Sequence, residues 1–164
     1  MKWQQTFRAD PACAALADRH YSRRAVGSLQ FAPPGRCVVL YSRTASGRAY
    51  WVTSWQRPEF VKHAWPDAWI CSAFRNEGAG LSSELITQAL AATRYAFGDP
   101  PAGLSMVTFV DPTKTKPKRH PGFCFLMAGF KKVGKTKGGL IALGIDRELM
   151  PAAEAPKHTQ ASLL

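Results

Sequence analysis

The sequence has no long apolar run, and its cysteines form no zinc-binding pattern. No stretch approaches the roughly 20 apolar residues that cross a bilayer, and the first residues carry no apolar segment like that of a secretory signal. The four cysteines lie far apart, without a Cys-x-x-Cys pair or a Cys/His group at zinc-like spacing. We therefore expect no structural zinc, reduced thiols and a cytoplasmic location.

Acidic residues are also scarce. The chain has 22 Lys and Arg against 11 Asp and Glu, which gives a formal net charge of +11 in 164 residues. Such a surplus favours a polyanionic partner, because phosphates are attracted over long range and release counterions on binding. The length suits one core and is short for two ordinary domains. We expect one domain over 1–150 and a loosely ordered tail over 151–164, which is rich in Ala, Pro and polar residues.

Hydrophobic patterning predicts alternating strands and helices, and hence an α/β (α+β) domain with a mixed sheet flanked by helices. A helix is expected to start at Pro11 and end near His20, and the helix over 81–92 places Leu81, Leu85 and Ile86 on one face. The expected strands cover 37–41, 49–55, 68–74, 104–110 and 140–143, and a brief helix falls within 123–130.

A glycine loop, Arg75-x-x-Gly78-x-Gly80, lies between the predicted strand 68–74 and the helix 81–92. At such a junction several backbone N–H groups and the positive end of the helix dipole face the same point, which suits a pyrophosphate. Glycines in a strand-to-helix turn often serve only the turn, and Ser82 and Ser83 fit helix caps as well as phosphate donors. The residues alone leave both interpretations open.

The glycine loop resembles the pyrophosphate-binding signature of the GNAT superfamily of N-acetyltransferases, whose acetyl-coenzyme A lies beside the preceding strand. The segment from Ala128 to Gly134 is similar to a turn that often joins the last helix and strands of that fold. This resemblance covers most of 1–150 and implies a single-domain GNAT-like fold. The positions that it implies for cofactor binding are Arg75, Asn76, Gly78, Ala79, Gly80, Ser82 and Ser83.

Three short motifs point to one family within this superfamily. They are His20-Tyr21-Ser22, Phe74-Arg75-Asn76-Glu77 and Asp111-Pro112. Together they resemble the phage Mom family, whose members convert adenine in DNA to N6-(methylcarbamoyl)adenine and so mask sites from restriction endonucleases. The resemblance implies acetyl-coenzyme A, double-stranded DNA and the cytoplasm of a bacterial host. It also implies active-centre roles for His20, Tyr21, Arg75 and Asp111, and bound iron, for which His20 and Tyr21 are candidate ligands and His63 and His120 possible additions.

Modification of adenine at N6 requires groups of the kind that these motifs contain. The N6 amine is a poor nucleophile, so a transferase needs a base, an oriented electrophile and a pocket for an extruded base. Asp111 or His20 could accept a proton, and Arg75 suits a phosphate or a polarised carbonyl. Each also has a structural alternative: a helix C-terminal partner for His20, a packing aromatic for Tyr21, a turn start for Asp111 and an ion pair for Arg75. A carbamoyl product further requires a nitrogen beside the carbonyl carbon, which acetyl transfer alone does not supply.

Basic residues concentrate in three segments that we expect to flank this pocket and to contact DNA phosphates. They are Arg23 and Arg24; Lys114, Lys116, Lys118 and Arg119; and Lys131, Lys132 and Lys135. Lysine-rich loops that are merely solvated are the alternative. Two other functions remain open: an ordinary GNAT enzyme that acetylates a protein or small-molecule amine, and a non-catalytic DNA-binding module without affinity for acetyl-coenzyme A.

Overall fold

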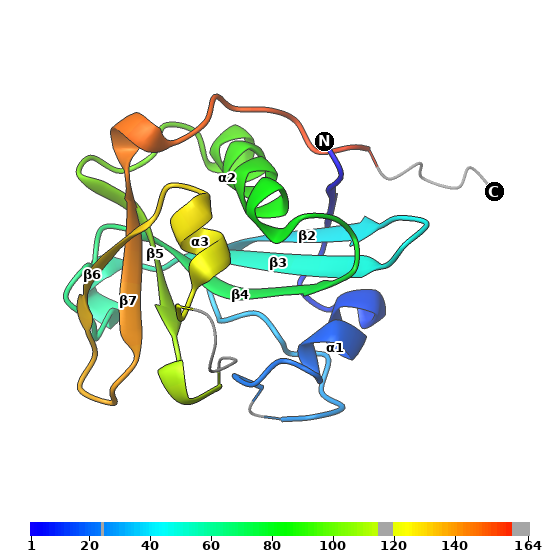
Figure 1. Ribbon diagram of the computed structural model, residues 1–164, viewed down its shortest axis with the longest axis horizontal. Helices are drawn as coiled ribbons and strands as arrows, with labels where there is room; N and C mark the ends of the chain where they lie inside the picture. The colour runs from blue at the N-terminus through cyan, green and yellow to red at the C-terminus, as the bar shows by residue number, and fades with distance from the viewer. Residues whose placement is uncertain (24, 115–119, 159–164) are drawn as a thin grey trace.

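The computed structural model describes residues 1–23, 25–114 and 120–158, and one mixed β-sheet runs through them (Figure 1). Its seven strands are arranged in the order β1-β2-β3-β4-β5-β7-β6. The strands are β1 (Gln4–Thr6), β2 (Arg36–Arg43), β3 (Arg48–Trp55), β4 (Trp69–Glu77), β5 (Leu104–Val110), β6 (Lys131–Lys135) and β7 (Ile141–Asp146). The α-helices are α1 (Pro11–Ala17), α2 (Ser82–Phe97) and α3 (Phe123–Met127), with 3-10 turns η1 (Pro58–Phe60), η2 (Pro112–Lys114) and η3 (Arg147–Leu149). The expected mixed α/β class is confirmed.

Helices cover both faces of the sheet, which is why β3 is buried along almost its whole length. Side chains of a strand alternate between its two faces. Trp51 accordingly joins the core beneath α2, together with Leu85 and Ile86. Tyr50 packs on the opposite face, in the smaller core that includes Leu16 of α1. The expected strands 37–41 and 49–55 are thus parts of an antiparallel hairpin, β2 and β3, at the centre of the fold. The two strands pair in register from Arg36↔Trp55 to Arg43↔Arg48.

The parallel pair β4 and β5 separates before either strand ends. The two strands are paired only where Trp69, Ile70 and Cys71 face Met106, Val107 and Thr108. Beyond this point β4 stays paired with β3 as far as Asn76 and continues to Glu77. The carboxyl ends of β4 and β5 point the same way because the strands are parallel. An opening therefore forms between them at the end where the glycine loop begins.

The basic segment that contains Lys131, Lys132 and Lys135 was expected to be a loop and instead forms the strand β6, at the edge of the sheet. The sequence Lys-Lys-Val-Gly-Lys has no alternation of apolar residues, so it carries no strand signal. Pairing with β7 provides the structure, and lysines are common on edge strands because they discourage pairing with other chains. Leu81 also departs from expectation: it is the N-cap of α2 and 62% exposed, whereas Leu85 and Ile86 are buried.

The first part of the expected loose tail packs against the domain. The Lys157 amide donates to the Trp3 carbonyl (2.8 Å), and the Glu154 amide donates to the Ala91 carbonyl (3.1 Å). The chain after η3 therefore runs along α2 and returns to the N-terminal strand, as Figure 1 shows. Residues 151–158 thus extend the packed unit beyond the expected boundary at residue 150.

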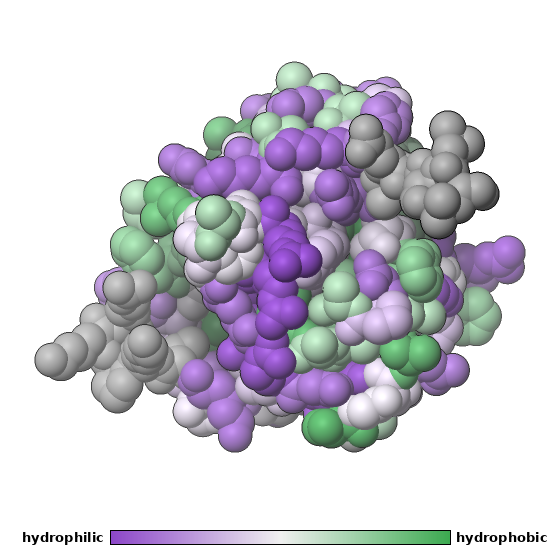
Figure 2. All heavy atoms as spheres, turned by 90° about the vertical axis from the view of Figure 1, so that its right-hand side faces the viewer, coloured by the Kyte–Doolittle hydropathy of each residue, from purple (hydrophilic) through white to green (hydrophobic). Residues whose placement is uncertain are grey.

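The molecular surface is largely polar on the face beside the β2–β3 hairpin and α1. Figure 2 shows hydrophilic side chains running through the centre of this face, with apolar side chains in separate patches around them. Within 1–23, 25–114 and 120–158, no helix combines the length and the apolar character that crossing a membrane would need.

Candidate functional site

The separation of β4 from β5 opens a cavity of about 310 Å³. His20 and Tyr21 line it from the segment after α1, and Arg75 and Asn76 from the end of β4. Ser82 lines it from the first turn of α2. Other lining residues come from β4, β5 and α3, among them Ser72, Phe74, Thr108, Phe109, Cys124 and Phe125. Residues from two of the three short motifs therefore meet at one cavity.

Asn76 fastens the glycine turn that borders this cavity. Its side-chain amide donates to the Gly80 carbonyl (2.7 Å) and to Ser82 Oγ (2.9 Å), and its Oδ1 accepts from the Ala79 amide (2.9 Å). Gly78 adopts φ +86°, which favours glycine, and a Cβ there would lie 2.9 Å from the Ser46 carbonyl oxygen. The turn conformation and the close contact with the β2–β3 hairpin are therefore enough to explain why residue 78 is a glycine.

Gly80 makes room for a positive charge beside the N-terminus of α2. A Cβ on Gly80 would lie 2.6 Å from the ammonium nitrogen of Lys2. The Lys2 amide donates to Gln88 Oε1 (2.6 Å), which ties the segment before β1 to α2. The N-cap Leu81 offers no side-chain cap to the first amides of the helix. The turn thus combines uncapped helix amides with a lysine ammonium, an arrangement that suits an anion.

Arg75 is held by the ion pair that the sequence left open as its structural alternative. Its Nε donates to Glu77 Oε2 (2.5 Å), and its Nη1 donates to the Arg19 carbonyl (2.7 Å). Arg19 in turn makes two hydrogen bonds of 2.7 Å to the Glu77 carboxylate. Hydrogen bonds from Arg19 and Arg75 lower the pKa of Glu77 to about 2. Arg75 therefore serves the structure, and it is also one of the residues that line the cavity.

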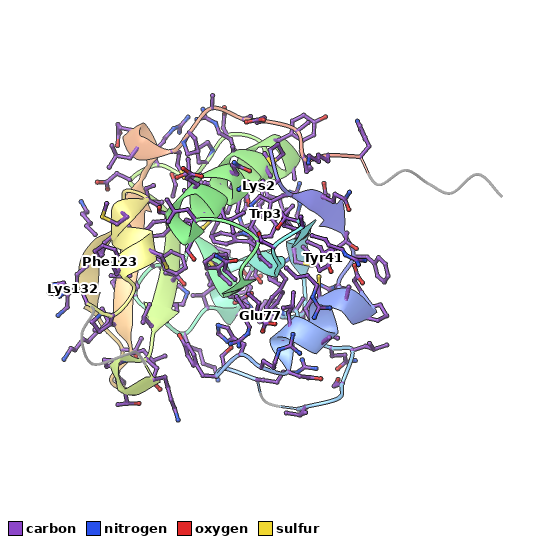
Figure 3. All side chains as sticks on the ribbon, turned by 45° about the vertical axis from the view of Figure 1, so that its right-hand side comes forward. Lys2, Trp3, Tyr41, Glu77, Phe123 and Lys132 are labelled. Carbon is purple, nitrogen blue, oxygen red and sulfur yellow. The ribbon has the colours of Figure 1, made fainter. Side chains whose placement is uncertain are left out.

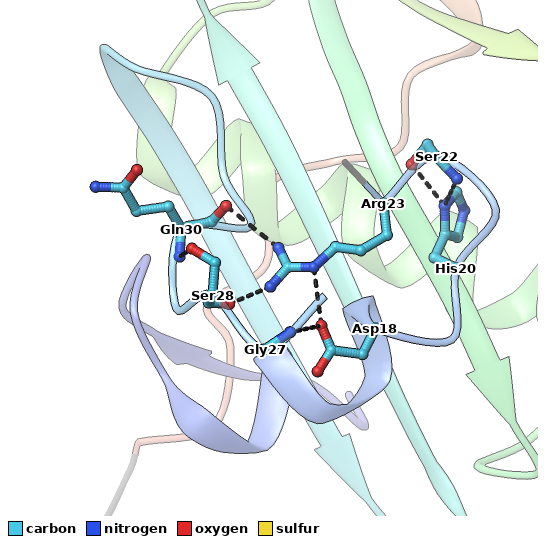
Figure 4. Close-up of polar contacts among 7 residues, drawn as sticks. All are labelled: Asp18, His20, Ser22, Arg23, Gly27, Ser28 and Gln30. Atoms are coloured by element: carbon cyan, nitrogen blue, oxygen red, sulfur yellow. Dashed lines mark hydrogen bonds and ion pairs between the residues drawn. The ribbon is translucent and has the colours of Figure 1, made fainter. Parts of the chain in front are cut away.

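The surroundings of His20 favour its neutral form and hold its ring in place. The rings of His20 and Tyr21 stack with centroids 4.5 Å apart. His20 Nδ1 accepts from the Ser22 amide (3.1 Å) and lies 2.6 Å from Ser22 Oγ, so we assign the proton of the neutral ring to Nε2 (Figure 4). Burial and the nearby Arg75 charge lower the pKa of His20 to about 4. The structural alternative for His20, a protonated partner of the α1 dipole, does not fit this neutral ring.

Asp111 lies at the end of β5, next to Tyr21. Its carboxylate accepts from the Thr113 amide (2.9 Å) and from Thr113 Oγ1 (2.6 Å). These hydrogen bonds lower the pKa of Asp111. Burial raises the pKa of the Tyr21 hydroxyl, while a hydrogen bond from the Asp111 backbone acts in the opposite direction. Asp111 thus forms the turn that Asp-Pro commonly starts, and its main chain contacts Tyr21.

The described residues do not provide an iron site. No three His, Cys, Asp or Glu side chains within 1–23, 25–114 and 120–158 come together as a metal-binding group. His20 Nδ1 is engaged by Ser22, which leaves the stacked pair with few free donor atoms. His63 packs instead against Phe109, with ring centroids 5.1 Å apart. Because this donor set does not fit iron, we derive no chemical step from a metal.

Of the expected DNA contacts, Arg23 has a structural role. Its side chain is 6% exposed and pairs with Asp18 (2.9 Å). It also donates to the carbonyls of Ser28 and Gln30 and so closes the loop after α1 (Figure 4). We therefore leave Arg23 out of the proposed DNA surface.

The remaining basic residues differ in their environment. Lys114 is exposed in η2, and Lys132 and Lys135 are exposed on β6. Lys131 pairs with Asp146 (2.8 Å). Figure 3 shows Lys132 on the same flank of the molecule as Phe123. The other expected contacts, Arg24, Lys116, Lys118 and Arg119, lie outside the described residues.

The cavity therefore brings a stacked aromatic pair and an arginine close to the first turn of α2, where Ser82 lines it. Lys2 and Gly80 lie beside that turn and are not among the lining residues. Of the residues named from the sequence, His20, Tyr21, Arg75, Asn76 and Ser82 line the cavity. The sequence did not point to Lys2, which lies beside Gly80, because a single lysine belongs to no local pattern. Comparisons of the chain with protein-family models, with curated proteins and with solved structures found no match.

Proposed function

We propose that this protein is a GNAT-like acyltransferase that binds acetyl-coenzyme A and modifies adenine in DNA, the function implied by the resemblance to the Mom family. The observation that carries the proposal is the opening between the parallel strands β4 and β5, which leads to the glycine turn and α2. The sheet order and the α2 connection between β4 and β5 are compatible with the GNAT-like fold that the resemblance implies.

Acetyl-coenzyme A fits the chemistry of this opening. A diphosphate would be held by the first amides of α2 and by the Lys2 ammonium beside Gly80. Beyond Cys71, the edge of β4 that faces β5 has no strand partner among the described residues, so its backbone groups can bind the amides of an extended ligand. When bound, the cofactor supplies an activated acyl group.

The aromatic pair gives the acceptor a place to bind. The Tyr21 side chain is 47% exposed, lines the cavity and is stacked on His20, so it offers a face on which an extruded base can stack. Burial raises the pKa of Tyr21, so its hydroxyl stays protonated and can donate a hydrogen bond to a ligand in the cavity. Arg75, which Glu77 and the Arg19 carbonyl hold in place, adds a guanidinium that suits a phosphate or a polarised carbonyl.

The lowered pKa values of His20 and Asp111 limit their part as bases. A group whose pKa lies far below 7 is a weak proton acceptor at neutral pH. We therefore propose that N6 attacks the thioester carbonyl carbon while it still carries its proton. The C–N bond would form as the C–S bond breaks, and the departing coenzyme A thiolate would take up the N6 proton. His20 and Asp111 then act chiefly by fixing the ring of Tyr21 and the end of β5.

The charge of the cavity favours a neutral acceptor over an ammonium. No Asp or Glu is among the described residues that line the cavity, whereas Arg75 is. An enzyme for lysine or polyamine nitrogen would gain from a carboxylate there, because the substrate arrives positively charged. Adenine N6 is uncharged, and the net charge of +11 suits the DNA that carries it.

Nucleoside analysis tests the proposal. The protein is produced in a bacterium, the host DNA is digested to nucleosides, and adenine derivatives are sought by mass spectrometry. We expect a new adenine derivative with the wild type and no such derivative with Tyr21→Phe or Arg75→Ala. The control Tyr95→Phe, which alters an exposed tyrosine of α2, should still give the derivative. Unmodified DNA together with acetylated protein would support an amine acetyltransferase, and no uptake of acetyl-coenzyme A in calorimetry would contradict the proposal.

A further inference from the structure

A second and larger hollow lies at the opposite end of β3 from the hairpin turn. It measures about 830 Å³ and is lined by Arg36 at the start of β2, by Trp55 at the end of β3, and by Arg57 and Phe60 around η1. We call it the Trp55 groove. None of the residues that line the cavity between β4 and β5 also lines this groove, so the two sites are separate.

The groove combines aromatic surface with positive charge that has no acidic partner. The Arg36 guanidinium carbon lies 4.9 Å from the ring centroids of both Trp55 and Phe97. Trp55 itself packs against Phe97 (5.2 Å) and Trp69 (5.7 Å), so the platform beneath Arg36 is rigid. Neither Arg36 nor Arg57 forms an ion pair with any described residue. No Asp or Glu is among the described residues that line the groove.

Phe60 presents an exposed aromatic ring at the groove. Its side chain is 72% exposed, although it belongs to the ordered turn η1 and lines the groove. An exposed aromatic ring beside unpaired arginines suits a ligand that is planar, apolar on its faces and negatively charged elsewhere. A nucleotide has all three properties, and the faces of its base are free for stacking only where the strand is unpaired.

We propose that the Trp55 groove binds a nucleotide of single-stranded nucleic acid, with the base stacked on Phe60 and the phosphates held by Arg36 and Arg57. The positive lining argues against a second copy of this chain, since two copies of the +11 molecule would bring like charges together. The inference goes beyond the proposed acyl transfer and does not depend on it, because it uses a different set of residues.

Fluorescence anisotropy with a labelled single-stranded oligothymidylate provides the test. Phe60→Ala removes an exposed ring, and we expect it to weaken binding by about 5- to 150-fold, the range for loss of one stacked base. The matched control Phe7→Ala removes a ring that is 60% exposed elsewhere, and it should leave affinity unchanged. Arg57→Gln should weaken binding more than Arg43→Gln, which removes the same charge from the exposed far end of β2.

Competition experiments sharpen the result. Single-stranded DNA or RNA should displace the label better than a duplex or inorganic polyphosphate at equal phosphate concentration. Equal affinity of Phe60→Ala and wild type, or equal competition by polyphosphate, would overturn the proposal. So would a wild-type dimer in solution that Phe60→Ala dissociates, because the groove would then be a contact between copies. Acetyl-coenzyme A binding by Phe60→Ala, measured in parallel, separates failure of this proposal from failure of the proposed function.

Discussion

Glu77 connects the segments on which the motif residues lie. Its carboxylate receives two hydrogen bonds from Arg19, directly before His20, and one from Arg75 of β4. Arg75 also binds the Arg19 carbonyl, so the two arginines and the glutamate form a closed network. The network fixes the loop after α1 against the end of β4. A residue that does not itself line the cavity thereby sets the position of two that do, His20 and Tyr21.

The variant Glu77→Gln tests this network. The Arg19 and Arg75 side chains are 44% and 34% exposed, so solvent weakens the ion pairs, and we expect a loss of about 1–2 kcal/mol in the free energy of unfolding at pH 7. The pKa of Glu77 is about 2 in the folded protein and 4.5 is the ordinary value. Because the pKa of Glu77 is lower in the folded protein than in the unfolded chain, its ionisation stabilises the folded state at pH values above the unfolded pKa. This contribution is lost as the pH falls from about 4.5 towards 2.

Urea unfolding at pH 7, 4 and 2.5 measures the effect. The difference between wild type and Glu77→Gln should be largest at pH 7 and should shrink at pH 2.5, while Glu59→Gln, an exposed change in η1, should match the wild type throughout. A difference that stays constant with pH would contradict the charged network.

Part of the candidate site was predicted from the sequence because several of its residues are neighbours along the chain. His20-Tyr21 and Arg75-Asn76 were recognised as short local motifs, and the fold brings both to one cavity. Lys2 reaches the same region through the pairing and packing of the N-terminal strand, which no local pattern reports. Arg23 was expected to contact DNA and instead closes its own loop. The sequence does not distinguish a basic residue that faces solvent from one that pairs within its loop.

At the scale of elements, the β2–β3 hairpin supports the glycine turn. Ser46 Oγ donates to the Gly78 carbonyl (2.7 Å), and Arg48 forms an isolated bridge with Gly78. Gly47 packs so closely that a Cβ would lie 2.0 Å from the Glu77 carbonyl oxygen. The conformation of the turn therefore depends on a hairpin that lies some distance away in the sequence.

Gly47→Ala should disturb both stability and the proposed anion site. The added methyl group meets main-chain atoms, which cannot rotate away, so we expect a loss of about 1–3 kcal/mol, as for other overpacked sites. Displacement of the turn should also weaken acetyl-coenzyme A binding. Gly138→Ala is the matched control, because its nearest neighbour, Thr136 Oγ1, would lie 4.0 Å away. Thermal unfolding and calorimetry measure the two effects, and wild-type values for Gly47→Ala would contradict this role of the hairpin.

Elements with a strong pattern were predicted well, and those formed by tertiary pairing were missed. The hairpin, β4, α2 and β5 each have an apolar run or a helical period, and all are present. The strands β1 and β6 are short, polar and at the edges of the sheet, so only their pairing with β2 and β7 defines them. The separation of β4 from β5, which creates the cavity, likewise depends on pairing that hydrophobic patterning does not report.

For the whole molecule, ion pairs among the described residues neutralise few of their basic side chains, so most of this positive charge remains unpaired. Several of the few acidic residues are already paired with a basic one, as in Asp18–Arg23, Glu77–Arg19 and Asp146–Lys131. The excess positive charge is therefore carried by residues without acidic partners, including Arg36. Long-range attraction of nucleic acid is a property of the whole surface, whereas the cavity and the Trp55 groove would fix particular groups.

Two separate sites predict two independent shifts in thermal unfolding. A ligand at 100 times its Kd stabilises the folded state by about 2.7 kcal/mol, which for a domain of this size raises Tm by about 5–11 °C. Acetyl-coenzyme A and a single-stranded oligonucleotide should each give such a shift, and together nearly their sum, because their lining residues do not overlap. Phe60→Ala should reduce the oligonucleotide shift and leave the other unchanged, because it weakens only the binding at the Trp55 groove. If the two ligands together gave no more than one alone, they would compete for one site, and the assignment of separate sites would be wrong.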